Sequence, residues 1–186
     1  MTEYELNPQK VKAEYENAVD YDLLTKIEKI INISRSASDS SKNLKGIIYR
    51  ISSVSQRAAS DIKHLTGIDV AGYASVIDGS HIIHIWKRHG ENGEADETMK
   101  NLKDLARIAY ILENYDNIEY KGGDSGYRNP DGSKGKVVAF HKRINGCYSV
   151  FEVVFNSKSK FLKVKTAYKK GVEETSPTPN RCAARC

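Results

Sequence analysis

The segment KVVAFHKRINGCYSVFEVVF, Lys136 to Phe155, decides the class of fold. Apolar and polar residues alternate on both sides of Asn145-Gly146, and a period of two is typical of a strand with one buried face. Asn-Gly favours a tight hairpin turn because both positions tolerate positive φ. A third β-rich run follows at Phe161 to Tyr168. The C-terminal half therefore predicts an antiparallel meander.

Upstream of this meander the apolar residues recur at helical spacing. Helices are predicted for Pro8 to Ala18, for the segment with Leu23, Ile27, Ile30 and Ile31 on one face, for Ser55 to Leu65 before Gly67, for Asp78 or Ser80 to Gly90, and for Asp96 to Asn114. Short strands are predicted at Gly46 to Ile51 and at Ile118 to Tyr120, the latter followed by a loop from Gly122 to Gly135. Helices first and strands afterwards predict an α+β fold, with N-terminal helices packed on an antiparallel β-sheet.

The chain of 186 residues is long enough for one well-cored domain with attached segments. Ser34 to Ser41 is rich in serine and aspartate, which compete for backbone hydrogen bonds and favour a linker. We therefore expect an N-terminal helical and linker segment at 1–41, a main domain at 42–172, and a tail at 173–186 that its two prolines extend.

Composition bounds the function classes. Hydrophobic residues make up 39% and charged residues 28%, which is ordinary globular usage, and no segment has the apolar length of a membrane span. The net charge of +5 is concentrated between Lys136 and Lys170, where nine Lys and Arg face Glu152 alone. This basic segment permits a polyanionic partner such as nucleic acid. Cys147, Cys182 and Cys186 are too few for a disulfide framework.

The segment HIIHIWKRHG, His81 to Gly90, carries the residues best suited to chemistry. Helical spacing places His81, His84 and Arg88 on one side. An imidazole can exchange protons near neutral pH, and a guanidinium can hold a phosphate while charge builds in the transition state. His89 and Lys87 add a second titratable group and another cation.

Two other interpretations of this helix stay open. Its histidines can be solvated residues of a basic surface whose isoleucines and Trp86 belong to the core. The pair His81-Ile-Ile-His84 also has the spacing of helical metal ligands, but no carboxylate accompanies it and the flanking cations oppose a divalent ion. We therefore expect no metal.

The last β-rich run offers a partner for the histidine helix. Strict alternation would place Leu162, Val164, Thr166 and Tyr168 on one face, and Lys163 and Lys165 on the other. A threonine hydroxyl can donate to a phosphate oxygen, and a tyrosine can stack on a base or donate a proton. We expect His84 and Arg88 to face Thr166 and Tyr168 across one cleft.

The order of these motifs resembles a known family. It runs Gly67-Ile-Asp-Val70, Ile77-Asp78, His84-Ile-x-Lys-Arg-His-Gly90, a long helix, a sheet, and Lys165-Thr-Ala-Tyr168. This order, over about residues 46 to 170, is similar to the phage-associated and polymorphic-toxin branch of the barnase–EndoU–colicin–RelE-like (BECR) nuclease superfamily.

The resemblance implies an endoribonuclease toxin that needs no cofactor or metal. Its motifs fall on His84, Arg88, His89, Thr166 and Tyr168 as catalytic residues, and Lys87, His81, Lys163 and Lys165 would bind substrate. RNA, with tRNA as the expected substrate, would be cleaved to 2′,3′-cyclic phosphate ends. An immunity protein would be a partner, and the chain would act in the cytoplasm of a target cell after delivery within a larger secreted or phage-packaged protein.

Three rival functions stay open on the residues alone. The chain can be a nucleic-acid-binding module without catalysis, an ADP-ribosyltransferase-type toxin that needs NAD, or a metal-dependent DNase that EDTA inactivates.

Overall fold

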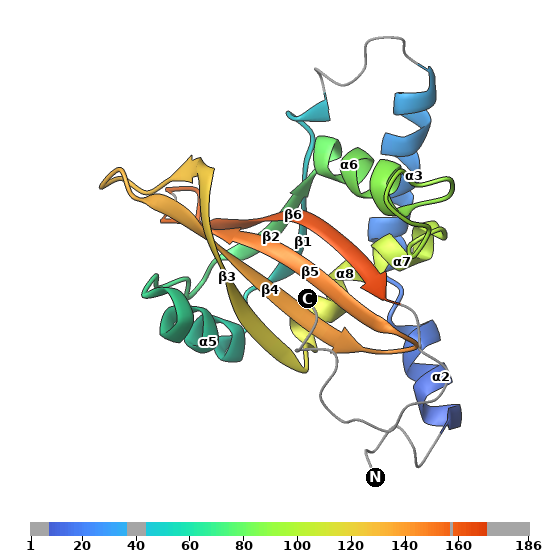
Figure 1. Ribbon diagram of the computed structural model, residues 1–186, viewed down its shortest axis with the longest axis horizontal. Coiled ribbons are helices and arrows are strands. Elements are labelled where there is room, and N and C mark those ends of the chain that lie inside the picture. The colour runs from blue at the N-terminus through green and yellow to red at the C-terminus, as the bar shows by residue number, and fades with distance from the viewer. Residues whose placement is uncertain (1–7, 37–43, 157, 171–186) are drawn as a thin grey trace.

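The computed structural model describes residues 8–36, 44–156 and 158–170 (Figure 1). The helices are α2 (Pro8–Asn17), α3 (Tyr21–Ser36), α5 (Gln56–Thr66), α6 (Gly79–His89), α7 (Leu102–Ala106) and α8 (Ile108–Glu113). The strands are β1 (Ile48–Ser53), β2 (Ala74–Asp78), β3 (Asn117–Arg128), β4 (Lys134–Arg143), β5 (Cys147–Val154) and β6 (Phe161–Lys170). Helices dominate the first part of the chain and strands the last, so the predicted α+β class is confirmed.

Within the described residues the strands form one sheet of order β1-β2-β6-β5-β4-β3. Every neighbouring pair is antiparallel except β2 and β6, which run parallel with Ala74 opposite Phe161. The antiparallel arrangement that the sequence predicted is therefore present in every neighbouring pair except this one. Strand β2 was not predicted as a strand, and its pairing brings the start of α6 next to the last strand.

The turn between β4 and β5 follows the prediction. Asn145 and Gly146 both have positive φ, 46° and 114°, as an Asn-Gly hairpin requires. By contrast, the loop predicted from Gly122 to Gly135 was wrong in its bounds, because β3 continues through half of it to Arg128 and β4 begins at Lys134. Glycines that looked like loop residues thus lie in an irregular strand.

The expected alternation along β6 was also wrong. Val164 pairs with Glu152 and Thr166 with Phe151, so Lys165 is an extra residue at a β-bulge. A single extra residue moves every later side chain to the opposite face of the sheet. Thr166 and Tyr168 consequently share a face with Lys163, and Ala167 takes the place in the core after Leu162 and Val164.

Capping residues delimit the two helices next to the sheet. Ser55 accepts from the Ala58 amide at the start of α5, and Gly67 ends that helix with φ 75°. Asp78 accepts from the His81 amide at the start of α6, and Gly90 ends it. These bounds confirm the predicted helices.

Two helical predictions need correction. The single helix expected from Asp96 to Asn114 is two short helices, α7 and α8, separated at Arg107, and 96–101 is not helical. The linker expected from Ser34 begins later, because α3 continues to Ser36. The rest of that linker and the tail lie outside the described residues.

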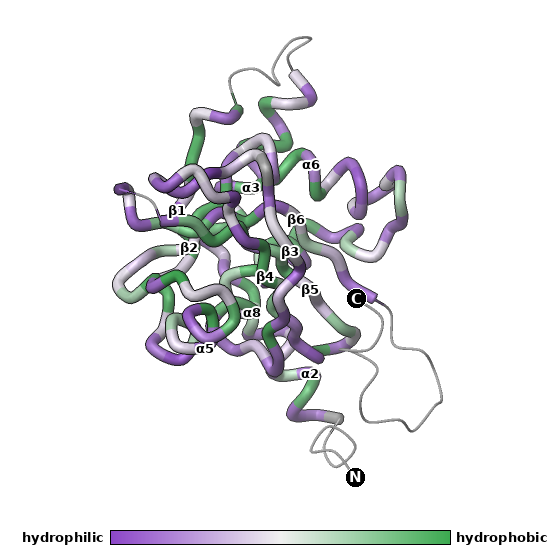
Figure 2. Tube along the Cα trace, turned by 60° about the vertical axis from the view of Figure 1, so that its left-hand side comes forward, coloured by the Kyte–Doolittle hydropathy of each residue, from purple (hydrophilic) through white to green (hydrophobic). Residues whose placement is uncertain are grey.

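One hydrophobic core unites the elements. Helix α8 contacts β1, β4 and β5, α6 contacts β2 and β6, and α3 contacts α6 and α7. The buried face of α3 (Leu23, Ile27, Ile30, Ile31) belongs to the same cluster as the sheet. In Figure 2 the hydrophobic segments gather in the middle strands and α8, and many hydrophilic ones lie at the periphery. The proposed boundary near residue 42 stays a prediction.

Two features of the sheet were not predicted from the sequence. Cys147, at the start of β5, is disulfide-bonded. Glu152, in the middle of β5, is buried on the core side, and no hydrogen bond among the described residues satisfies its carboxylate oxygens. Burial raises the pKa of Glu152 to about 7, although the nearby Ser75 hydroxyl weakly favours the ionised form.

Candidate nuclease site

Helix α6 separates its residues into two faces as its spacing predicts. Ile82, Ile85 and His89 are buried, and His84 and Arg88 are exposed, with His81 between these extremes. The buried face packs on β2 and β6, and α3 covers another side. The polar face therefore borders the edge where β2 and β6 run parallel.

Asp78 organises the start of this helix. Its carboxylate accepts from the His81 amide at 2.8 Å and from the Ser80 hydroxyl at 2.6 Å, and it contacts His81 Nδ1 at 2.8 Å. Lys163 Nζ lies 2.6 Å from the other carboxylate oxygen. Burial opposes ionisation, but these contacts together hold the pKa of Asp78 well below its usual range.

The ionised state of Asp78 orients His81. A carboxylate can only accept, so Nδ1 of His81 is the donor and Nε2 is the remaining nitrogen of the ring. Nδ1 is thus bound to the protein. Nε2 is the atom that can exchange a proton with a ligand.

A cleft of about 560 Å³ opens beside this pair. Its lining comes from the start of α6, from β6, from β3 and from the segment before β1: Lys45, Asp78, Ser80, His81, His84, Gly126, Tyr127, Lys163 and Lys165. Two imidazoles and three lysines thus face one space.

The two lysines of β6 that line the cleft are held by carboxylates on different elements. Lys163 pairs with Asp78, and Lys165 at the bulge pairs with Asp124 of β3. Asp124 also accepts from the Gly126 amide at 2.8 Å, which fixes the turn of β3 at the cleft. Both carboxylates are nearly inaccessible, whereas the Lys165 side chain is 48% exposed. The cations therefore remain the groups that a ligand can reach.

His84 titrates in a cationic environment. Burial lowers its pKa most, and His81, Arg88, His89 and Lys165 lower it further. Neighbouring positive charges disfavour a second one, so His84 is predominantly a neutral base at pH 7.

His89 lies apart from this cleft. Its Nδ1 contacts the two carboxylate oxygens of Asp96 at 3.0 and 2.9 Å, and its ring lies 5.6 Å from that of Tyr168. Asp96 also accepts from the Thr98 hydroxyl, and Thr98 accepts from the Lys169 amide. This network ties the segment after α6 to β6.

The structure therefore assembles only part of the expected site. His81, His84, Lys163 and Lys165 come together in the cleft, and Arg88 is close enough to affect His84. Thr166 and Tyr168 share a face with Lys163, but neither is among the cleft-lining residues, and Tyr168 meets His89 instead of His84. Lys87 is exposed and does not line the cleft either. The catalytic roles stay predictions.

Several polar residues of this region were not considered as site residues from the sequence. Asp78 was expected to cap the helix and belonged to the motif order of the resemblance, but it was not expected in the site, and Lys45, Asp124 and Tyr127 were not considered. Only the position of Asp78 before the histidine helix was a usable signal. The other three reach the cleft through long-range contacts that no local pattern reveals.

A second imidazole–carboxylate cluster lies further along the sheet. His141 Nδ1 contacts the Ser149 hydroxyl at 2.9 Å, and its Nε2 contacts Glu119 at 3.2 Å. His141 is 1% exposed. Burial lowers its pKa, and Glu119 opposes that effect. Its inaccessibility makes it a buried polar network instead of a ligand site.

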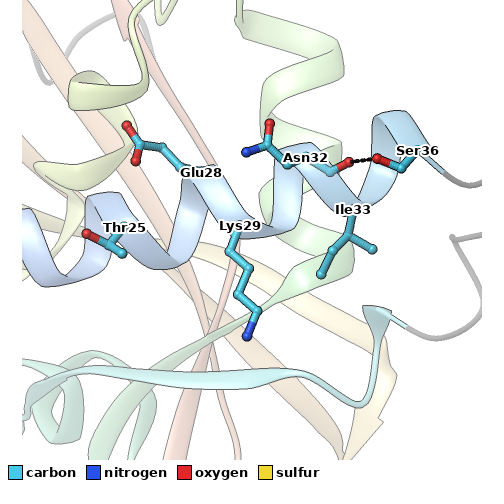
Figure 3. A pocket seen from close by; sticks show the side chains of 6 residues that line it. All are labelled: Thr25, Glu28, Lys29, Asn32, Ile33 and Ser36. Atoms are coloured by element: carbon cyan, nitrogen blue, oxygen red, sulfur yellow. Dashed lines mark hydrogen bonds between the residues drawn. The ribbon is translucent and has the colours of Figure 1, made fainter.

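Size alone does not identify the site. A hollow of about 570 Å³ runs along α3, where Lys29 and Ile33 extend to one side and Glu28 and Asn32 to the other (Figure 3). Its polar side chains do not converge, and the Ser36 hydroxyl is bonded to the Asn32 carbonyl at 2.8 Å. The cleft beside α6 is the better candidate because its charged groups face one space.

Across the described residues, no group of three or more His, Cys, Asp or Glu side chains is placed to hold a metal ion. No helix in the described part of the chain has the length and apolar character needed to cross a membrane.

An α+β fold in which a capped helix meets the last strand at a cationic, imidazole-bearing cleft defines a class of small nucleases. Residues 52–176 match the model of the family described as phage-Barnase-EndoU-ColicinE5/D-RelE like nuclease3, and the chain belongs to this family. The expected BECR membership is thus confirmed, and nucleic acid is the implied substrate. No curated protein and no solved structure matches the chain.

Proposed function

We propose that this nuclease is an endoribonuclease that cleaves RNA by attack of its own 2′-hydroxyl. The observation that carries the proposal is the pair of imidazoles, His81 and His84, in one cleft with Lys163 and Lys165. One histidine is held by a carboxylate, and burial together with nearby cations lowers the pKa of the other. Two such groups suffice for proton transfer at both ends of the reaction.

The two histidines divide the proton transfers. Neutral His84 accepts the proton of the 2′-hydroxyl as that oxygen attacks phosphorus. His81, whose Nδ1 is bonded to Asp78, donates a proton from Nε2 to the 5′-oxygen as the bond between that oxygen and phosphorus breaks. The products are a 2′,3′-cyclic phosphate and a 5′-hydroxyl, and no water is consumed.

The lysines of the cleft stabilise the additional negative charge on the phosphorane. Lys163 is positioned by Asp78, and Lys165 projects from the bulge with about half its side chain exposed. Lys45 adds a third cation, and Arg88 can contact the substrate from the exposed face of α6. Fixed cations at the site of charge development are an effective source of catalysis.

The residues near the far end of α6 receive a positioning role. His89, held by Asp96 and packed against Tyr168, keeps the end of α6 on β6. Thr166 lies on the same face between Lys163 and Tyr168, where its hydroxyl can contact a neighbouring phosphate. Lys87 and Arg88 extend the cationic surface along the helix.

The way the carboxylates are used supports metal independence as part of the proposal. A divalent ion needs accessible carboxylate ligands, whereas Asp78 and Asp124 are both paired with lysines. Binding a metal there would require breaking two ion pairs in a cationic cleft.

The biological setting belongs to the same proposal. Basic residues along β6 favour a structured RNA such as tRNA, because phosphate contacts give affinity without base information. A toxin of this kind acts in the cytoplasm of a target cell, after delivery in a larger secreted or phage-packaged protein. An immunity protein would present acidic residues to the cleft.

The test compares the parent with His84→Ala and with His64→Ala. His64 is exposed on α5, which contacts β3 instead of α6, so the two substitutions match in chemistry and differ in place. We expect cleavage of total tRNA in EDTA, a loss of about 10²- to 10⁴-fold in His84→Ala, and no change in His64→Ala. Analysis of the ends should show cyclic phosphates.

Three outcomes would contradict the proposal. Absence of cleavage by the parent leaves a nucleic-acid-binding module. Activity lost in EDTA, with DNA as the substrate, supports a metal-dependent DNase. Equal activity of His84→Ala and His64→Ala removes His84 from the mechanism.

A further inference from the structure

One residue that lines the cleft belongs to a row of aromatic rings. Tyr127 of β3 lines the cleft with the two histidines. Its ring lies 5.2 Å from the ring of Phe155 at an angle of 36°, and Phe155 meets Phe161 edge-on at 5.7 Å. Tyr127, Phe155 and Phe161 are all partly accessible. A row of partly exposed rings that ends beside Lys163 differs from an ordinary core cluster.

Several contacts hold the Tyr127 ring in place. Gly135 lies close to the base of the side chain, because a Cβ added to Gly135 would lie 3.0 Å from the Cβ of Tyr127. Asp124 fixes the preceding turn through the Gly126 amide and pairs with Lys165. The ring is therefore positioned before any ligand arrives, which reduces the entropy cost of stacking on it.

Lys163 links this ring to the phosphate-binding part of the cleft. Its Nζ lies 5.6 Å from the centroid of the Tyr127 ring. Burial opposes the charge of Lys163, yet hydrogen bonds to Asp78 and Tyr127 raise its pKa. The ammonium thus lies over the ring at this distance, and a phosphate bound to it would place the adjoining base near the ring.

We propose that Tyr127 is a stacking platform for an unpaired base next to the scissile phosphate. Phe155 supports one side of the ring, and the base stacks on the side that faces the cleft. A base in a duplex is covered by its neighbours and cannot reach this ring. The nuclease therefore selects single-stranded or looped RNA, an inference that rests on the proposed function.

Binding, without cleavage, tests the platform. The probe is a fluorescent 2′-O-methyl RNA oligonucleotide, which keeps the RNA shape and lacks the attacking hydroxyl, used single-stranded and annealed to its complement. Stacking of one base on an aromatic ring changes Kd by about 5- to 150-fold. We expect Tyr127→Leu to weaken single-strand binding by such a factor and to leave duplex binding unchanged, and Tyr127→Phe to retain the affinity.

Tyr120 provides the matched control. It lies on the same strand and is 44% exposed, but it pairs with Val138 of the core face. Tyr120→Leu should leave both affinities unchanged. Lys165→Gln should weaken single-strand and duplex binding alike, because a phosphate contact carries no base information.

An abasic probe keeps the proposal testable if Tyr127→Leu does not fold. The affinity of the parent should fall by the same factor when the bases of the oligonucleotide are removed. A folded Tyr127→Leu variant should bind the abasic and the normal probe with equal affinity. Equal binding of single strand by parent and Tyr127→Leu, or equal binding of abasic and normal probes by the parent, would overturn the platform. Such a result would leave the loss of cleavage in His84→Ala unaffected, so the stacking proposal can fail while the proposed nuclease mechanism holds.

Discussion

Asp78 is the residue whose substitution tests the architecture of the site most directly. Asp78→Asn keeps a side-chain oxygen that can cap α6, because Asn and Asp are about equally good at this position. It removes the negative charge that Lys163 contacts at 2.6 Å. The substitution thus separates the ion pair from the cap.

The expected loss can be worked out from burial. The Asp78 side chain is 1% exposed and that of Lys163 is 16% exposed, so the lysine would keep a charge with little access to water. Removing one partner of a buried pair costs about 3–5 kcal/mol. Because Lys163 reaches solvent in part, we expect about 3 kcal/mol for Asp78→Asn, and about 1 kcal/mol more for Asp78→Ala, which also loses the cap.

The lowered pKa of Asp78 also determines how its contribution to stability changes with pH. The folded-state pKa of Asp78 lies well below its ordinary value of 3.8, so its stabilisation is fully present above about pH 4 and is lost as the pH falls through the lower folded value. The free energies of unfolding of the parent and of Asp78→Asn should converge toward acid.

Urea unfolding followed by the fluorescence of Trp86, the single tryptophan, measures this difference between pH 3 and pH 7. A gap that is as large at pH 3 as at pH 7 would refute an electrostatic role for Asp78. A gap below about 0.5 kcal/mol at pH 7 would refute the buried ion pair itself.

Three further predictions concern single residues. The parent should lose stability as the pH rises from 4.5 to 7, because the Glu152 carboxyl ionises at lower pH in the unfolded chain than in the folded one, and Glu152→Gln should abolish this loss. The shift of the pKa from 4.5 to about 7 corresponds to about 3 kcal/mol at pH 8. Equal urea midpoints of the parent and Glu152→Gln at pH 8 would contradict the prediction. Lys165→Gln should move the acidic limb of the pH–rate profile to higher pH, since a cation that lowers the pKa of His84 is removed. Gly90→Ala should lower stability by about 1–3 kcal/mol, because its Cβ would lie 2.5 Å from the Trp86 carbonyl oxygen; an unchanged Tm would exclude this clash.

Some of the candidate site follows from α6 alone. Helical spacing correctly separated the exposed His84 and Arg88 from the buried Ile82 and Ile85, because a helix fixes the direction of each side chain relative to its neighbours. The spacing could not decide which histidine would border a cleft. That depends on β6 and β3, which approach α6 only in the folded chain.

The last strand shows a second feature that the sequence pattern could not predict. Its composition predicted a strand correctly, but the bulge at Lys165 moved Thr166 and Tyr168 to the face of Lys163. A bulge depends on the register of β5 against β6, and no residue of the strand by itself indicates its position. The predicted meeting of His84 with Tyr168 accordingly became a contact between His89 and Tyr168.

The sequence by itself determined the elements whose backbone groups are satisfied within a few residues: α5 between Ser55 and Gly67, α6 between Asp78 and Gly90, and the turn at Asn145-Gly146. Tertiary structure alone decided the parallel pairing of β2 with β6, and with it the cleft. Residues 74–76 and 161–163 are far apart in the chain, and their pairing depends on closing that long segment around a common core.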